Sequence, residues 1–307
     1  MQRRALLLGL SALGAACGPK ALPAPPPAPS VTSASELIPA DLDVVARLDW
    51  GRMKGALGSL ALSALSREVL ANSGAGRDTD ELVVASLLVA DQVYLGYRPS
   101  PLLMPLDRVL AVQGHFEPLT RAPAGFSAAV DLGGDFRYWD RRPGGRLERG
   151  SVARIYAYRD RVRAFVSEAE LDSVERILTG QGSERRLTPP EEGTLSLAAR
   201  TWLLARLTGR GSLREMLDDA KTLMVVADLE SDGIRLEVEL TLANADRAQN
   251  LANAGQQVLA RLAPRLGGSA VLRADGDRVV LTATLRRGQL MPALLCLRNP
   301  GDPGCAW

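Results

Sequence analysis

Alternation of hydrophobic and polar residues is clearest between residues 221 and 242. Residues 221–229 form a β-rich run, and a turn at 230–233 separates them from a second run. In this second run, 234–242, every second residue is aliphatic, while Arg235, Glu237 and Glu239 lie between. A period of two with one polar face is typical of an antiparallel strand with one buried face. The pattern therefore predicts a hairpin.

A helical pattern follows this hairpin directly. Asn244 is placed to act as an N-cap, and we expect Pro264 to end the helix. Apolar residues recur between them at Ala248, Leu251, Ala252, Val258, Leu259 and Leu262. This spacing predicts an amphipathic helix. The whole unit is thus strand, turn, strand and helix.

Two further hairpins show the same arrangement. They are expected at 151–158 with 161–167, and at 270–275 with 278–286, the latter before a short helix at 287–297. After the earlier hairpin, Ser167 and Glu170 have the spacing of a capping box, and Gly180 is placed to close the helix that follows. Hairpins followed by helices, without parallel crossovers, indicate an α+β fold.

The remaining elements allow the chain to be divided into two similar βα-ββα-ββα halves, although chance similarity of common units is the competing explanation. The first half is expected to hold a strand at 43–49, a helix at 55–72, and strands at 92–98 and 108–117. The second opens with a strand at 194–200 and a helical stretch to about 220. We expect antiparallel sheets with helices packed on one face. The predicted segments are a signal peptide (1–16), a lipidated cysteine with a proline-rich tether (17–35), the first half (36–180), a linker (181–193), the second half (194–297) and a disulfide-closed tail (298–307).

The N-terminus has the parts of an export signal. Arg3 and Arg4 precede an uncharged run at 5–16, which is too short to span a membrane, and small residues lead into Cys17. The segment GAAC at 14–17 resembles the lipobox of bacterial lipoproteins, with Gly14 where leucine is commoner. The resemblance implies diacylation of Cys17, cleavage before it and acylation of the new amine. Ordinary secretion with a chance cysteine is the alternative.

Details of export and sorting follow from neighbouring residues. The Arg3-Arg4 pair fits either an ordinary basic start or twin-arginine export. Gly18 is not the aspartate that retains lipoproteins in the inner membrane of enteric bacteria. By that analogy we expect an outer-membrane anchor that faces the periplasm. Residues 18–30 contain six prolines and read as a tether of roughly 40 Å or, alternatively, as a proline-rich motif for a partner.

The charge balance and the cysteines bear on nucleic-acid binding and on disulfide formation. The chain holds 37 basic and 35 acidic residues, so without Arg3 and Arg4 the mature protein is formally neutral. A neutral balance does not favour nucleic-acid binding. Cys296 and Cys305 bracket a turn-rich segment, which in an oxidising compartment indicates a disulfide. A metal site or a redox dithiol fits this spacing less well.

Signatures of catalysis are missing from the sequence. The single histidine, His115, excludes metal motifs that need two histidines, and it is interpreted as an incidental residue at a strand end. No G-x-S-x-G, S-x-x-K, Walker A or G-x-G-x-x-G motif occurs in a suitable context. A carboxylate pair of the glycosidase type leaves no sequence signature. We expect a non-enzymatic protein without catalytic residues, cofactor or metal.

Two segments are candidates for ligand binding. The loop 98–107 holds apolar residues between prolines, and it either forms an apolar patch for a partner or membrane or packs on the core. Its candidate residues are Leu102, Leu103 and Met104. The segment 135–150 combines aromatic residues with arginines and either recognises a glycan or anionic lipid headgroup or forms a solvated hairpin. Its candidate residues are Tyr138, Trp139, Arg141 and Arg142.

Two stretches carry a wider resemblance. PADLDVVARLDW at 39–50 and DGDRVVLTATL at 275–285 are similar to segments of lipoproteins and secreted proteins of myxobacterial type, which are built of hairpin–helix units. The resemblance implies a fold and no particular activity. The leading hypothesis is a membrane-anchored, non-catalytic periplasmic module that binds an envelope protein or other envelope component. A carrier of a lipid or other apolar ligand is the second, and an envelope hydrolase a distant third.

Overall fold

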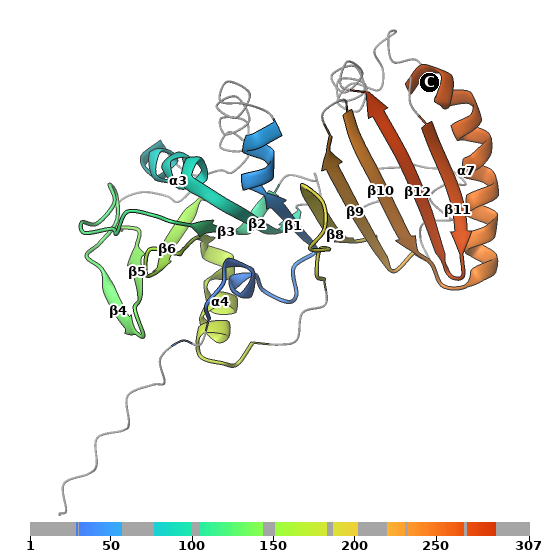
Figure 1. Cartoon of the computed structure of the whole chain (residues 1–307). Coiled ribbons are helices and arrows are strands. Elements are labelled where there is room, and N and C mark those ends of the chain that lie inside the picture. Colours follow the sequence, from blue (N-terminus) through green and yellow to red (C-terminus); the bar gives the residue numbers. More distant parts are fainter. Residues whose placement is uncertain are drawn as a thin grey trace, which may run out of the picture.

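One antiparallel sheet runs through the whole fold (Figure 1). The computed structural model describes residues 29, 31–56, 77–99, 105–143, 151–182, 187–201, 220–230, 233–266 and 269–286. Within these residues the sheet has 12 strands in the order β11-β12-β10-β9-β8-β1-β2-β3-β7-β6-β5-β4. The α+β class with antiparallel strands is therefore confirmed.

The elements have the following bounds. The strands are β1 Val44–Asp49, β2 Ala90–Pro99, β3 Pro105–Gly114, β4 Val130–Gly133, β5 Phe136–Asp140, β6 Val152–Tyr158, β7 Val162–Ser167, β8 Leu195–Arg200, β9 Thr222–Leu229, β10 Gly233–Thr241, β11 Ser269–Asp275 and β12 Arg278–Arg286. The helices are η1 Ala34–Leu37, α3 Arg77–Val89, η2 Glu168–Glu170, α4 Leu171–Leu178 and α7 Ala245–Leu266, and residues 50–56 are also helical.

The strand order repeats. Strands β1, β2, β3, β7 and β6 lie side by side in the first half, and β8, β9, β10, β12 and β11 follow the same connectivity in the second. The halves meet where β1 pairs with β8, with Ala46 opposite Leu197. One difference separates them: the hairpin β4–β5 occupies the place that α7 has in the second half. The helix that the βα-ββα-ββα division implies at that point of the first half is therefore replaced by strands.

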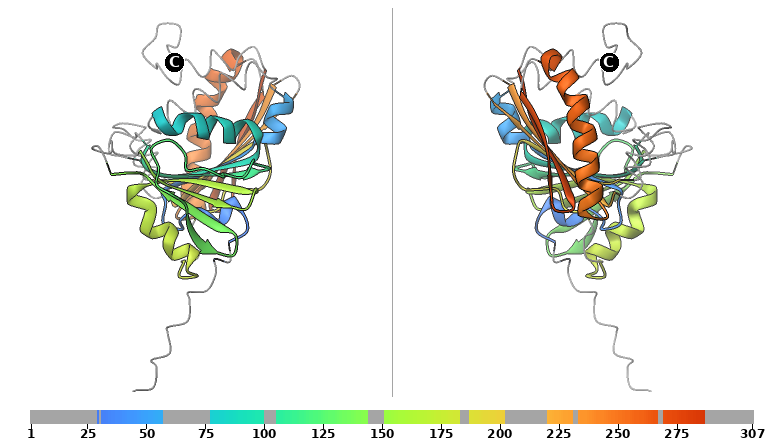
Figure 2. Two further views of the ribbon diagram at one scale, coloured as in Figure 1. Left: turned by 90° about the vertical axis from the view of Figure 1, so that its left-hand side faces the viewer. Right: turned by 90° about the vertical axis from the view of Figure 1, so that its right-hand side faces the viewer.

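Helices lie on both faces of the first half (Figure 2). Helix α3 packs through Val83 and Leu87 on one face, which we call the α3 face. Helix α4 and η1 pack through Val174 and Leu37 on the other, the α4 face. The strand register can be followed from β2 through β1, β8 and β9 to β10. It shows that the residues packed under α7 lie on the α3 face as well. All six residues of strand β7 are buried, because packed elements cover both faces of the sheet there.

Most predicted strands are confirmed to within a few residues, and the N-cap at Asn244 is present, since its Oδ1 accepts the amide of Arg247 at 3.0 Å. The capping box at Ser167 is wrong. Its hydroxyl accepts the amide of Arg108 at 2.9 Å instead, and Glu170 pairs with Arg98. Helix α7 also continues to Leu266, past the predicted end at Pro264.

Several predictions concern residues outside the described ranges. These are most of the helix at 55–72, the helical stretch after β8, the helix at 287–297, and everything before residue 29. Helix α3 was not predicted at all. No helix among the described residues is long and apolar enough to cross a membrane.

Candidate functional site

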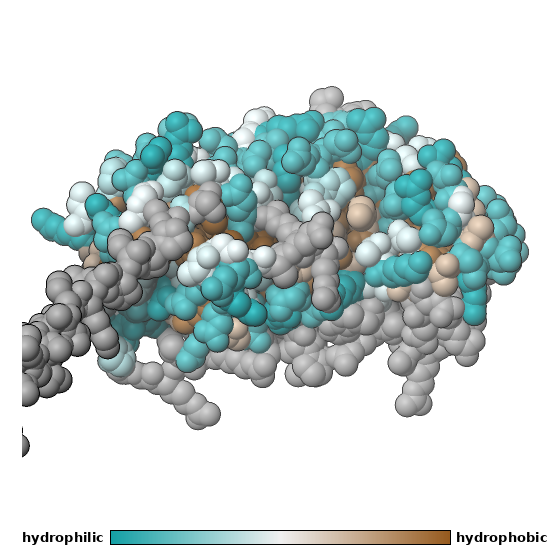
Figure 3. Space-filling view, turned by 90° about the horizontal axis from the view of Figure 1, so that it is seen from below, coloured by the Kyte–Doolittle hydropathy of each residue, from teal (hydrophilic) through white to brown (hydrophobic). Residues whose placement is uncertain are grey.

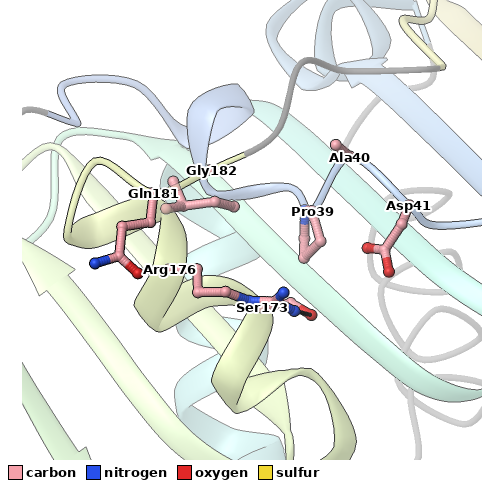
Figure 4. A pocket seen from close by; sticks show the side chains of 8 residues that line it. Pro39, Ala40, Asp41, Ser173, Arg176, Gln181 and Gly182 are labelled. Atoms are coloured by element: carbon pink, nitrogen blue, oxygen red, sulfur yellow. Dashed lines mark hydrogen bonds between the residues drawn. The ribbon is translucent and has the colours of Figure 1, made fainter.

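A small cleft opens between α4 and the segment that leads from η1 into β1 (Figure 4). Its volume is about 120 Å³. The lining residues are Pro39, Ala40, Asp41, Ser173, Arg176, Ile177, Gln181 and Gly182. Gln181 and Gly182 follow α4, where Gly180 ends the helix in the left-handed region at φ 73°. That turn brings both residues back against the helix, so that three short segments (39–41, 173–177 and 181–182) surround the cleft.

Asp41 forms one wall of the cleft and is held by Arg98 of β2. The Nη2 of Arg98 lies 2.7 Å from Oδ2 of Asp41, and its Nη1 donates to the Asp41 carbonyl at 2.8 Å. Burial raises the pKa of Asp41, but the hydrogen bond and charge of Arg98 outweigh it, and Arg176 across the cleft adds to the lowering. The net result is a pKa below the ordinary value, so Asp41 is an anion at neutral pH.

Arg98 also binds a second carboxylate deeper in the fold. Its Nε donates to Oε1 of Glu170 at 2.7 Å. Glu170 is 1% exposed, and its Oε2 makes no hydrogen bond. Burial raises the pKa of Glu170, and the contact with Arg98 offsets this only in part. The Arg98 guanidinium thus contacts two carboxylates, Asp41 and Glu170. Burial disfavours the anionic form of Glu170.

The opposite wall of the cleft is basic. Figure 4 shows the side chain of Arg176 extending from α4 toward the side of Asp41. Within its own helix Arg176 makes long contacts, from Nε to the Asp172 carbonyl at 3.3 Å and from Nη2 to Oγ of Ser173 at 3.4 Å. Arg176 is exposed, so the cleft opens to solvent at this wall. The surface seen from below, on the side of α4, is mostly hydrophilic, with hydrophobic colour confined to a band (Figure 3).

A second polar cluster stabilises the same helix from the sheet. Arg154 of β6 donates to Asp140 at 2.6 Å and to the Tyr156 hydroxyl at 3.1 Å, and it also pairs with Glu175 of α4. Its guanidinium lies 4.2 Å from the ring centre of Tyr138. Burial raises the pKa of Tyr156 to about 12, against the opposing hydrogen bond from Arg154. This cluster fixes α4 in place, and with it the basic wall of the cleft.

The α3 face carries a different feature, an aliphatic surface that we call the apolar strip. It lies on three neighbouring strands and consists of Leu195 and Leu197 of β8, Val225, Ala227 and Leu229 of β9, and Ile234, Leu236 and Val238 of β10. Every one of these residues is half-buried. The register aligns them in cross-strand rows, of which Leu197, Val225 and Val238 form one. The strip is therefore continuous across the strands.

Half-burial is unusual for strands in the middle of a sheet. All eight residues of β9 are half-buried, whereas all six of β7 are buried. Helix α3 packs on β2 and β3, and α7 packs on β11 and β12. Among the elements that the structure describes, these two helices leave most of the strip between them, while Leu229 at its end packs against the cluster that includes Trp50 and Met53 of the helical residues 50–56. The strip has no aromatic or charged side chain, and its backbone groups are paired within the sheet.

The aromatic candidates from the sequence do not form one surface. Tyr138 lies half-buried on the α4 face, where Arg154 covers its ring. Trp139, the next residue in β5, is 2% exposed and belongs to the core under α3. Adjacent strand residues point to opposite faces, so the two cannot contact one ligand. The interpretation of Trp139 as a binding residue is wrong.

The other candidates are more scattered. Arg141 lies 5.6 Å over the Phe126 ring, and Arg142 is exposed. His115 is exposed just beyond β3. Among the described residues, no group of three or more His, Cys, Asp or Glu could hold a metal ion. The remaining predicted site residues lie outside the described ranges: Cys17, Leu102, Leu103, Met104, Cys296 and Cys305.

Sequence reasoning missed both the cleft and the strip. Arg98 and Glu170 are 72 residues apart, so no local motif joins them. The strip was visible as alternation in 234–242, but the pattern indicates only that one face is apolar and not whether a helix covers it.

Comparison with known proteins bears on the fold alone. No family model and no curated protein matches the chain. The structure is similar to crystal form I of TP0453, with a TM-score of 0.54 and 11% identity over 87% of this chain and 99% of that chain. Crystal forms III and IV of TP0453 give TM-scores of 0.52 at 12% identity, over 86% of this chain and 98% and 97% of those chains. This protein thus shares its fold with TP0453.

Proposed function

We propose that this protein is a lipid-anchored, non-catalytic binding module of the bacterial cell envelope, and that its ligand is apolar. The anchoring rests on the sequence from Arg3 to Cys17 and on the proline-rich segment after it. The nature of the ligand rests on one observation, the half-buried apolar strip across β8, β9 and β10.

The composition of the strip favours an acyl chain over a protein partner. Protein interfaces draw most of their binding energy from Trp, Tyr and Arg anchors, and the strip has none. A peptide that adds to a sheet needs unpaired backbone groups, which central strands do not offer. Aliphatic side chains in flat rows instead offer contact to a flexible hydrocarbon, which gains roughly 0.8 kcal/mol for each methylene it buries.

A binding experiment with strip variants tests the proposal. We expect purified protein to bind a fluorescent fatty acid saturably and to retain lipid in native mass spectrometry. Val225→Asn places a polar group in the central strand of the strip, and we expect it to weaken binding about ten-fold or more, because it removes buried apolar contact.

Val271→Asn is the matched control. Val271 is 60% exposed on β11, and its side chain lies on the face opposite the strip. It should leave binding unchanged. Absence of any lipid binding by the unaltered protein, or equal binding by a folded Val225→Asn variant, contradicts an apolar ligand at the strip and returns the envelope-protein hypothesis to first place.

A further inference from the structure

The cleft beside α4 presents opposite charges on facing walls, and this arrangement is independent of the apolar strip. Arg176 and the hydroxyl of Ser173 lie on the helix, and Asp41 lies on the segment before β1. Arg98 already pairs with Asp41 at 2.7 Å. Arg176 reaches toward Asp41 from across the cleft without taking that place (Figure 4). A ligand in the cleft therefore meets hydrogen-bond donors from Arg176 and Ser173 on one side and the Asp41 carboxylate on the other.

We infer that the cleft binds a small zwitterionic group, with a phosphate or carboxylate at Arg176 and Ser173 and an ammonium group at Asp41. The anion receives charge-assisted hydrogen bonds from the guanidinium and from the hydroxyl. The ammonium group donates to a carboxylate that is half exposed, with 50% of its side chain accessible.

The charge state of each wall supports this polarity. Although Asp41 pairs with Arg98, half of its side chain is exposed, so its carboxylate can accept further hydrogen bonds from the cleft. The contacts of Arg176 within its helix are 3.3 and 3.4 Å long, and these weak contacts are readily exchanged for an anionic ligand. The volume of about 120 Å³ suits a small group such as a phosphate with a short ammonium-bearing chain and is too small for a folded peptide.

Two sources offer this chemistry, a free small molecule and the headgroup of an aminophospholipid. The shared feature is an anion a few bonds away from a primary ammonium group. The probes are O-phosphoethanolamine, ethanolamine alone and inorganic phosphate alone, titrated calorimetrically at low ionic strength. A second arm measures binding to phosphatidylethanolamine vesicles against phosphatidylcholine vesicles, whose quaternary ammonium cannot donate a hydrogen bond.

We expect O-phosphoethanolamine to bind saturably and about ten-fold more tightly than either half alone, because only the zwitterion uses both walls. Arg176→Gln and Ser173→Ala should each weaken it, the former about ten-fold. Arg137→Gln, which alters a 57% exposed arginine on β5, is the matched control and should have no effect. Asp41→Asn tests the acidic wall. If this variant unfolds, Ser173→Ala still tests the cleft, because Ser173 takes no part in the ion pair between Asp41 and Arg98.

The calorimetric and vesicle experiments distinguish a free small molecule from a lipid headgroup. Binding of the free probe supports a soluble ligand, and binding only to phosphatidylethanolamine vesicles, with the same loss in Arg176→Gln, supports a headgroup. Phosphate alone binding as tightly as the zwitterion overturns the proposal, because Asp41 then plays no part. Binding to neither probe nor vesicle, or an equal loss in Arg137→Gln, also overturns it. None of these outcomes bears on lipid binding at Val225.

Discussion

Glu170 shows how a single buried side chain links the core to the cleft. It is 1% exposed, one of its oxygens contacts Arg98, and the other makes no hydrogen bond. A raised pKa means that the folded protein holds this proton to a higher pH than the unfolded chain does. The contribution of Glu170 to stability therefore falls as pH rises from about 4.5 through its raised pKa.

Glu170→Gln removes this titration. We expect the free energy of unfolding of the variant to lose the downward component that the unaltered protein shows as pH rises above 4.5. Urea unfolding at a series of pH values between 4 and 8 measures the difference. Glu168→Gln, at an exposed position of the same turn, should keep the slope of the unaltered protein. Identical slopes in all three proteins contradict a raised pKa at Glu170.

Asp41 changes the pH dependence of stability in the opposite direction to Glu170, and it does so at lower pH. Its pKa is lowered, so its contribution to stability is present above the ordinary value of 3.8 and is lost as pH falls below it. The two carboxylates that share Arg98 thus dominate different parts of the pH curve. The sequence could not reveal this, because only the fold brings Asp41, Arg98 and Glu170 together.

Local patterns predicted the elements of this protein where one face is polar and the other is apolar. Strand β10 and helix α7 were found because their alternation and their N-cap are visible within a few residues. Helix α3 was missed because its charged residues are confined to 77–81, while 82–89 is apolar on nearly all sides, with Leu88 and Val89 50% and 48% exposed. A helix whose charged residues lie at one end instead of along one face shows no clear period of 3.6 residues.

Helix α7 allows a quantitative test of local structure. Asn244→Ala removes the side-chain acceptor of the Arg247 amide, and we expect the free energy of unfolding to fall by about 1 kcal/mol. Asn244→Asp keeps an acceptor at the cap and should remain within a few tenths of a kcal/mol. Chemical denaturation followed by circular dichroism measures both. Equal stability of the alanine variant and the unaltered protein contradicts the cap.

On the scale of the whole molecule, one sheet joins two halves of the same connectivity. Their similarity was predicted from the succession of units, but the pairing of β1 with β8 that joins them was not. The sequence reads ARLDW at 46–50 and AARTW at 198–202, so Trp50 stands one residue after β1 and Trp202 two residues after β8. Because these offsets differ, the tryptophans do not align the two central strands residue by residue, and the pairing could not be predicted from them.

Placement in the envelope depends on the N-terminus. Cys17→Ala should abolish incorporation of a fatty-acid probe, because Cys17 is the proposed acceptor of the lipid. Metabolic labelling of cells that express the protein provides the measurement. Cys305→Ala should leave labelling intact. Label retained by the Cys17→Ala protein excludes lipidation at this position and leaves ordinary secretion.

The twist of the long sheet has a geometric consequence for the apolar strip. Neighbouring strands rotate by roughly 20–25° on average, and five steps separate β2 from β12, so the supports of α3 and α7 are turned by roughly 100–125° relative to each other. Two straight helices on such supports diverge, and neither can follow the saddle between them. The twist thus explains why, among the described elements, neither α3 nor α7 covers the middle of the sheet. The hydrocarbon chain that we propose as the ligand can bend along such a twisted surface, so we expect it to bind there without unfolding of either core.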